Sequence, residues 1–162
     1  MSWGETLFLS KILKSQRKYG ASDSVLAVLT SSTEELEGNG TKNLSCNFTP
    51  KVDGSVRIEV DVQPISTAGQ TRIPYGGYFR ILKDGVVIAD SGYVRKYYDE
   101  NEAVYVYVNN GIRHIDIPIV KNSKYTFQLY SDERNGYGGI TASNIKVCGQ
   151  VVDLSMLNYF TE

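Results

Sequence analysis

Histidine and adjacent carboxylates are the side chains that could carry acid–base chemistry in this chain. The sequence has a single histidine, His114, and two acidic pairs, Asp99-Glu100 and Asp132-Glu133. A glycoside hydrolase needs two carboxyl groups about 5–10 Å apart across a cleft, but both pairs lie in polar, turn-like stretches that predict solvated loop charges. His114 shares its parity with Asp116 and alternates with isoleucines, which predicts a solvent-facing strand residue rather than a base.

Other catalytic and metal-binding patterns are absent from the sequence. It has no Gly-x-Ser-x-Gly nucleophile motif, no glycine-rich phosphate loop and no His-Glu-x-x-His spacing. Two separated cysteines, Cys46 and Cys148, and one histidine do not supply the four ligands of a structural zinc site, and no EF-hand spacing is present. We therefore expect a non-enzymatic protein with no catalytic, cofactor or metal site.

Tyrosine is the residue type in excess, with 12 copies against five phenylalanines and one tryptophan. A tyrosine offers a rigid apolar face and a polar tip, which suits both protein interfaces and contact with sugar rings. The alternative is that Tyr105 and Tyr107 share one strand face and pack against a neighbouring sheet. As candidates for glycan contact we take Tyr93, Tyr97, Tyr98 and Tyr137.

Alternating strands are expected to position these tyrosines. From Ser55 to Gln63, four apolar residues share one parity and polar residues the other, which predicts a strand with one buried face. Asp84-Gly85 and Asn110-Gly111 can supply the positive φ angles of tight hairpin turns. We expect these turns to join the strands of two hairpins, 77–83 with 86–90 and 104–108 with 112–119.

Two further strands, at 125–131 and 140–152, follow these hairpins, and Pro118 predicts a strand end or a sheet edge. Short strands at this spacing, with no helical periodicity between them, predict an all-β fold. We expect an antiparallel β-sandwich of the jelly-roll type with an N-terminal extension, rather than a closed barrel.

Composition excludes several classes of partner. The chain has 17 Lys and Arg against 18 Asp and Glu, so we expect neither nucleic-acid binding nor a polybasic membrane patch. No stretch approaches the roughly 20 apolar residues of a membrane span, and the first residues lack the apolar run of a signal peptide. Synthesis in a cytoplasm favours two buried thiols, with a Cys46–Cys148 bridge as the alternative.

The first 36 residues differ from the rest and are expected to form an arm, followed by the sandwich at 37–153 and a tail at 154–162. The arm either packs on its own sandwich or reaches a neighbouring subunit. The arm has two apolar patches, one between Leu7 and Leu13 and one between Val25 and Leu29. The second patch could be a short helix or a strand. The residues that we expect at an assembly interface are Trp3, Leu7, Phe8, Leu9, Ile12, Leu13, Val25, Leu26 and Leu29.

The opening residues 1–11 (MSWGETLFLSK), followed by a polar stretch and a β-rich body, resemble small structural proteins of tailed bacteriophages and phage-like particles of Gram-positive bacteria. Residues 124–130 (KYTFQLY) and 144–152 (NIKVCGQVV) are similar to jelly-roll modules in the tails, baseplates and fibres of such particles. The resemblance implies a virion component assembled in the host cytoplasm beside other particle proteins. It also implies a homo-oligomer, for which we expect a trimer. The alternative is a carbohydrate-binding or receptor-binding module for bacterial cell-surface glycans.

Overall fold

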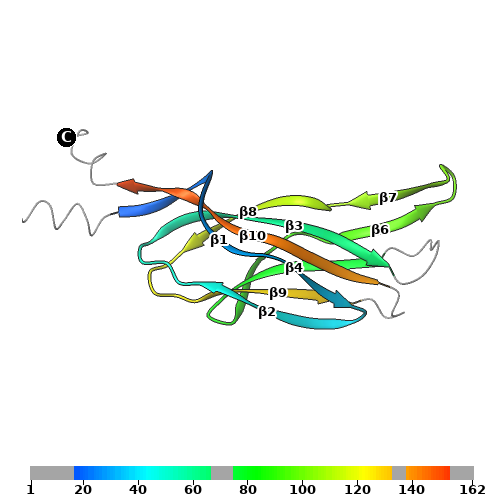
Figure 1. Ribbon diagram of the computed structural model, residues 1–162, viewed down its shortest axis with the longest axis horizontal. Coiled ribbons are helices and arrows are strands. Elements are labelled where there is room, and N and C mark those ends of the chain that lie inside the picture. Colours follow the sequence, from blue (N-terminus) through cyan, green and yellow to red (C-terminus); the bar gives the residue numbers. More distant parts are fainter. Residues whose placement is uncertain (1–16, 67–74, 133–137, 154–162) are drawn as a thin grey trace, which may run out of the picture.

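The structure, a computed structural model, describes residues 17–66, 75–132 and 138–153. All described elements are strands (Figure 1), and no helix of the length and apolarity of a membrane span occurs in these ranges. The strands are β1 (Arg17–Glu37), β2 (Gly40–Phe48), β3 (Gly54–Ser66), β4 (Tyr75–Lys83), β5 (Val86–Asp90), β6 (Val94–Asp99), β7 (Val104–Val108), β8 (Gly111–Ile119), β9 (Tyr125–Ser131) and β10 (Gly138–Asp153).

The strands form two sheets that pack as a sandwich. One sheet has the order β1-β10-β3-β8 and the other β2-β9-β4-β6-β7, with β5 also paired to β4. The first strand lies beside the last, and the chain crosses between the sheets at β1–β2, β2–β3, β3–β4, β7–β8, β8–β9 and β9–β10. This is the strand order of a jelly roll. The predicted fold class is therefore confirmed.

The core fills the space between the sheets and follows the predicted parities. In β3 the four apolar residues from Val56 to Val62 are at most 1% exposed, and they face Phe79, Phe127 and Leu129 of the other sheet. Fully burying one such side chain contributes about 1.5–3 kcal/mol. In β3, β4 and β9 the opposite parity lies on the outer face of the sheet, where side chains such as Arg57, Arg80 and Gln128 reach solvent.

The first predicted hairpin is present and the second is not. Asp84 and Gly85 have φ angles of 49° and 84° and join β4 to β5. Asn109 and Gly111 also have positive φ, but they carry the chain from β7 in one sheet to β8 in the other. The predicted pairing of 104–108 with 112–119 is therefore wrong: β7 pairs with β6, and β8 pairs with β3.

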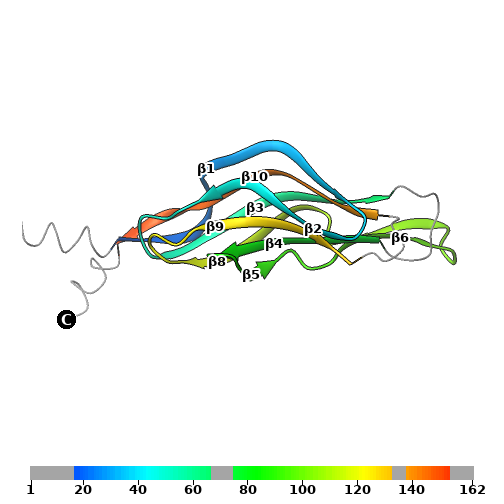
Figure 2. The same ribbon diagram turned by 90° about the horizontal axis from the view of Figure 1, so that it is seen from below.

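Residues 17–36 are part of the sandwich rather than of a separate arm. They belong to β1, which pairs with β10 along most of its length through four register shifts. These irregularities interrupt the two-residue period, so the sequence left this segment open between helix and strand. In Figure 2 the middle of β1 bows away from the sandwich. Residues 1–16 and 154–162, and hence Trp3 to Leu13 of the predicted interface, lie outside the described ranges.

The second apolar patch of the predicted arm lies on β1. Leu29 is half-buried against the core, which corresponds to packing on its own sandwich. Val25 and Leu26 are 53% and 43% exposed.

Candidate functional site

The single histidine lies in an ion-pair network on the outer face of the β1-β10-β3-β8 sheet. Its Nε2 is 3.1 Å from a Glu59 carboxylate oxygen, and the Lys146 ammonium is 3.4 Å from the other oxygen of the same carboxylate. The hydrogen bond from His114 and the nearby Lys146 lower the pKa of Glu59. Arg57 donates to both oxygens of Asp116 and lowers its pKa in the same way.

Of the predicted carboxylate pairs, Asp99 ends β6 and Glu100 begins the turn that follows it. Asp99 accepts hydrogen bonds from the backbone N–H groups of Asn101 and Glu102, 2.9 and 3.3 Å away. Asp132 is exposed, and Glu133 lies outside the described ranges. Glu35 has a raised pKa because it shares a hydrogen bond with Glu37, but both side chains are exposed on β1 and line no cleft that the structure describes. In the described residues no group of three or more His, Cys, Asp or Glu side chains could hold a metal ion.

The two cysteines are free thiols, Cys148 buried and Cys46 half-buried. Burial raises the pKa of both thiols.

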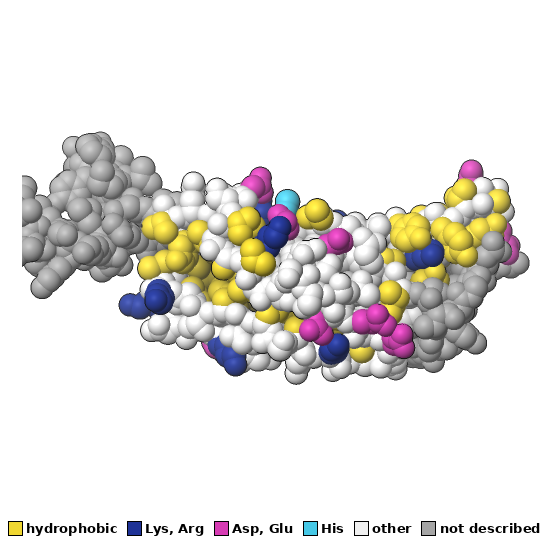
Figure 3. Space-filling view, in the orientation of Figure 1, with side chains coloured by type: hydrophobic (Ala, Val, Ile, Leu, Met, Phe, Trp, Pro, Cys, Tyr) yellow, Lys and Arg dark blue, Asp and Glu magenta, His cyan; other side chains and the backbone are white. Residues whose placement is uncertain are grey.

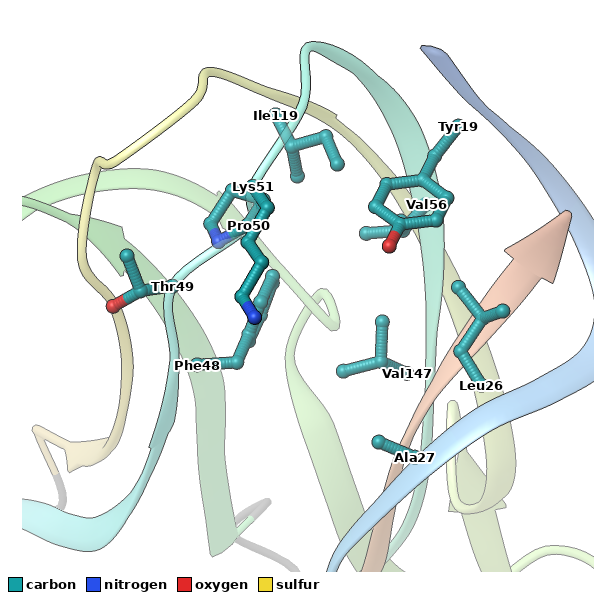
Figure 4. A pocket seen from close by; sticks show the side chains of 10 residues that line it. All are labelled: Tyr19, Leu26, Ala27, Phe48, Thr49, Pro50, Lys51, Val56, Ile119 and Val147. Atoms are coloured by element: carbon teal, nitrogen blue, oxygen red, sulfur yellow. The ribbon is translucent and has the colours of Figure 1, made fainter. Parts of the chain in front are cut away.

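A cleft of about 530 Å³ opens between the sheets at the end where β1 begins. In Figure 4, Tyr19, Leu26 and Val147 lie on one side of it, and Phe48 and Lys51 on the other. Its lining is mainly apolar, with one ammonium group and no carboxylate, histidine or cysteine.

A continuous row of tyrosine and arginine side chains lies on the outer face of the other sheet. Its members come from β4, β9, β6 and the residue before β6, and they share the outward parity of their strands. We call this row the tyrosine–arginine stripe, which consists of Arg80, Tyr130, Tyr78, Tyr93, Arg95 and Tyr97.

Contacts run along the stripe without a gap. The Arg80 guanidinium carbon lies 3.6 Å from the Tyr130 ring centroid. The Tyr78 centroid is 6.0 Å from that of Tyr130 and 5.3 Å from that of Tyr93, which is stacked on it at 20°. Arg95 then lies 5.9 Å from Tyr93 and 5.8 Å from Tyr97. These spacings are within the range of cation–π and aromatic attraction, so the row forms one ordered surface.

Polar side chains lie beside the stripe at its Arg80 end, and the two arginines of the stripe have N–H groups available for a ligand. The Gln128 amide donates to Asn43 at 2.9 Å and lies 3.5 Å from the Arg80 guanidinium. Within the described chain, neither Arg80 nor Arg95 forms an ion pair, and the buried Nε of Arg95 has no hydrogen-bond partner. A buried donor without a partner is costly until an acceptor reaches it. The stripe thus offers half-buried rings together with hydroxyl, amide and guanidinium groups.

The structure separates the predicted glycan contacts. Tyr93 and Tyr97 lie in the stripe, whereas Tyr98 is on the opposite face of the β6–β7 hairpin, and Tyr137 lies outside the described residues. Tyr98 contacts Tyr105 edge-on at 5.3 Å. Tyr105 and Tyr107 share this face but are 39% and 47% exposed, so they are not packed under a neighbouring sheet.

Sequence reasoning missed Tyr78, Arg80, Tyr130 and Arg95. Their outward parity could be read from the sequence, because Tyr78 and Arg80 flank Phe79 and Tyr130 follows Leu129. The pairing of β4 with β9 and β6, which places them side by side, could not be read, because these strands are not consecutive in the chain.

Comparison with known proteins assigns no family. No protein-family model and no curated protein matches the chain. Among solved structures, the chain is similar to a family 35 carbohydrate binding module from an environmental isolate, with 13% sequence identity and a TM-score of 0.36. The match covers 79% of this chain and 93% of that chain. A likeness this distant assigns no ligand to this protein.

Proposed function

We propose that this chain is a non-enzymatic binding module that recognises a bacterial cell-surface glycan through the tyrosine–arginine stripe. The observation that carries the proposal is the ordered contact of four tyrosine rings and two guanidinium groups on one solvent-facing sheet surface. Exposed tyrosines beside polar side chains are what glycan binding requires, because aromatic rings contact the C–H groups of a sugar while hydrogen-bonding groups meet its hydroxyls.

Preorganisation also supports this assignment. Each ring of the stripe is held by a neighbour, and the inward residues between them, Phe79 and Leu129, are fully buried. Side chains that are already ordered lose little conformational entropy when a ligand binds. A rigid surface of this kind suits a ligand with many weakly interacting hydroxyl groups.

Affinity electrophoresis of the full chain in gels containing soluble cell-wall polysaccharide from Gram-positive bacteria tests the proposal. We expect retardation of the wild-type protein, and Tyr130→Ala should weaken the affinity about tenfold or more, since truncated aromatic anchors commonly cost over 1.4 kcal/mol. His114→Ala, on the other sheet, is the matched control and should migrate like the wild type. Equal retardation of the wild type and Tyr130→Ala would show that the stripe does not bind the polysaccharide.

The second candidate function is a structural component of a phage or phage-like particle, held by residues near its N-terminus. The arrangement of the ends favours it: Arg17 pairs with Asp153 at one end of the molecule, and the β6–β7 hairpin projects at the other (Figure 1). A protein attached at the first end would present the hairpin and the adjoining part of the stripe outward.

Deletion of residues 1–16 tests this attachment, since it leaves β1 intact. We expect the full chain to sediment with particles and the shortened chain to remain in the supernatant. Equal incorporation of both would exclude anchoring by these residues.

A further inference from the structure

The β6–β7 hairpin ends in an open sheet edge. It extends beyond the sandwich (Figure 1), and β7 is the last strand of its sheet. Over the described ranges β7 pairs only with β6. Alternate N–H and C=O groups of β7 therefore point away from the protein and can accept another strand.

The sequence of β7 lacks the charged residues and prolines that normally keep an edge strand from pairing with another chain. Val104 to Val108 reads Val-Tyr-Val-Tyr-Val, with no charge, proline or glycine. Val104, Tyr105 and Tyr107 are 49%, 39% and 47% exposed, and Figure 3 shows hydrophobic side chains gathered at this end of the molecule. By contrast, the edge strand β8 of the other sheet carries a proline and three charged or ionisable side chains. Natural edges without such residues pair readily with other strands.

The strand is also palindromic, which makes it complementary to itself. We propose that β7 pairs antiparallel with β7 of a second copy about Val106, forming a two-fold dimer with a continuous four-stranded ribbon. In this register Val104 lies opposite Val108 of the other copy, and Tyr105 lies opposite Tyr107. Antiparallel aromatic pairs are favourable when directly opposite, and a two-fold contact of one patch with itself closes after two copies.

Charge and side-chain order agree with this register. No charged side chain lies in β7. The nearest charged residue before the strand, Glu102, falls opposite the neutral Asn110 of the second copy. On the tyrosine face Lys96 already lies 4.3 Å from the Tyr105 ring centroid and 5.2 Å from that of Tyr107. The rings are therefore held on one face before pairing.

The dimer also places the two copies of the stripe on the same face of the ribbon. Because Val106 lies opposite Tyr97 on the stripe side of the ribbon, the dimer would bring the two stripes toward one another.

Site-specific cross-linking of the full chain with a short bis-maleimide tests the register. Val106→Cys should form a covalent dimer, because each copy places this residue opposite itself. Val108→Cys alone should not, since its two copies lie four residues apart, about 13 Å along the strands. A mixture of Val104→Cys and Val108→Cys should again give the dimer. Wild type, with Cys46 and Cys148 only, sets the background.

Light scattering supplies the second readout. The wild-type chain should have twice its 18.0 kDa mass, and Val106→Lys should be a monomer with an unchanged unfolding midpoint. A wild-type monomer, a trimer, a Val106→Cys yield at the wild-type background, or equal cross-linking of Val108→Cys alone would each overturn the proposal. None of these outcomes depends on glycan binding, so this proposal and the proposed function fail separately.

Discussion

The buried hydroxyl of Ser91 forms two hydrogen bonds with the backbone. Its Oγ accepts from the backbone N–H of Phe79 at 3.0 Å and donates to the carbonyl of Gly92 at 2.8 Å. Its own carbonyl lies 3.4 Å from the Arg113 guanidinium of the other sheet. One residue thus ties β4 to the β5–β6 connection and the connection to β8.

Ser91→Ala should lower the free energy of unfolding by about 1–3 kcal/mol, because it leaves the buried N–H of Phe79 without an acceptor. Urea denaturation followed by fluorescence measures the change. Ser45→Ala, at an exposed position of β2, should change the midpoint little. An equal response of the two variants would mean that Phe79 finds another partner.

The carboxylate of Glu59 should make stability depend on pH. Its pKa lies below the ordinary value of 4.5 because it accepts a hydrogen bond from His114 and lies near Lys146. A lowered acid pKa stabilises the folded state above the unfolded-state value, and this stabilisation is lost as the pH falls through the folded-state pKa. We expect Glu59→Gln to be less stable than the wild type at neutral pH, by about 0.2–1 kcal/mol for a pair at the surface.

Urea titrations at a series of pH values test this. The difference between wild type and Glu59→Gln should shrink progressively below about pH 4.5. Glu102→Gln, in an exposed turn, controls for loss of one negative charge. A difference that stays constant with pH would show that the amide perturbs packing rather than a titrating ion pair.

Individual parities were the part of the site that the sequence could predict. Alternation placed Val56, Ile58 and Phe127 inside, as observed, and His114 outside. It also placed Tyr97 and Tyr98 on opposite faces, although both had been grouped as glycan contacts by proximity in the chain. Tyr93 and Tyr97 joined the stripe because a period of two keeps residues 93, 95 and 97 on one side.

Among the elements, the junction of β4 and β6 decides whether the stripe is continuous. A Cβ on Gly76 would lie 1.7 Å from the Val94 carbonyl oxygen. Only a glycine allows the two strands to approach this closely, and the approach brings Tyr93 onto Tyr78.

Gly76→Ala should therefore separate β6 from β4 and destabilise the fold by about 1–3 kcal/mol or more. Thermal unfolding and near-ultraviolet circular dichroism, which reports on the stacked tyrosines, measure the two effects. Gly85→Asn is the matched control: that glycine has φ +84° with nothing near its Cβ, and asparagine tolerates this region. Unaltered stability of Gly76→Ala would show that the strands can shift without cost.

Turn chemistry could be predicted only where the flanking strands are partners. Asp84-Gly85 lies between strands that pair, so the hairpin followed from local sequence. A positive φ angle was also anticipated at Gly111, but Asn109 rather than Asn110 adopts the other one, and these conformations serve a crossing between sheets. The pairing of β8 with β3 fixes this choice, because it buries Ile117 and Ile119 against the core. Such long-range partners cannot be read from one turn.

At the scale of the whole molecule, the fold class followed from strand spacing and the absence of helical periodicity, whereas the domain boundary did not. The predicted boundary after residue 36 falls at the end of β1, the strand that pairs with β10. An edge strand with four register shifts has no regular alternation of apolar and polar residues. Its place in the sheet could be predicted only from its pairing with β10, which lies over 100 residues later in the chain.

The two faces and the two ends of the sandwich carry different kinds of side chain. One sheet displays ion pairs around Glu59 and Arg57, and the other displays the tyrosine–arginine stripe. The apolar cleft lies beside the start of β1, and the hairpin with its open edge projects from the far end (Figure 1). The stripe and the cleft are thus distinct candidates for a ligand, and they can be told apart by experiment.

The most direct measurement of the proposed function is a two-dimensional amide NMR titration of the full chain with soluble oligosaccharides from Gram-positive cell walls. We predict saturable shifts of the amides around Tyr78, Tyr93 and Tyr130, with those around His114 unmoved. Shifts confined to the cleft near Tyr19 and Lys51, or no shifts at millimolar sugar, would contradict glycan recognition by the stripe.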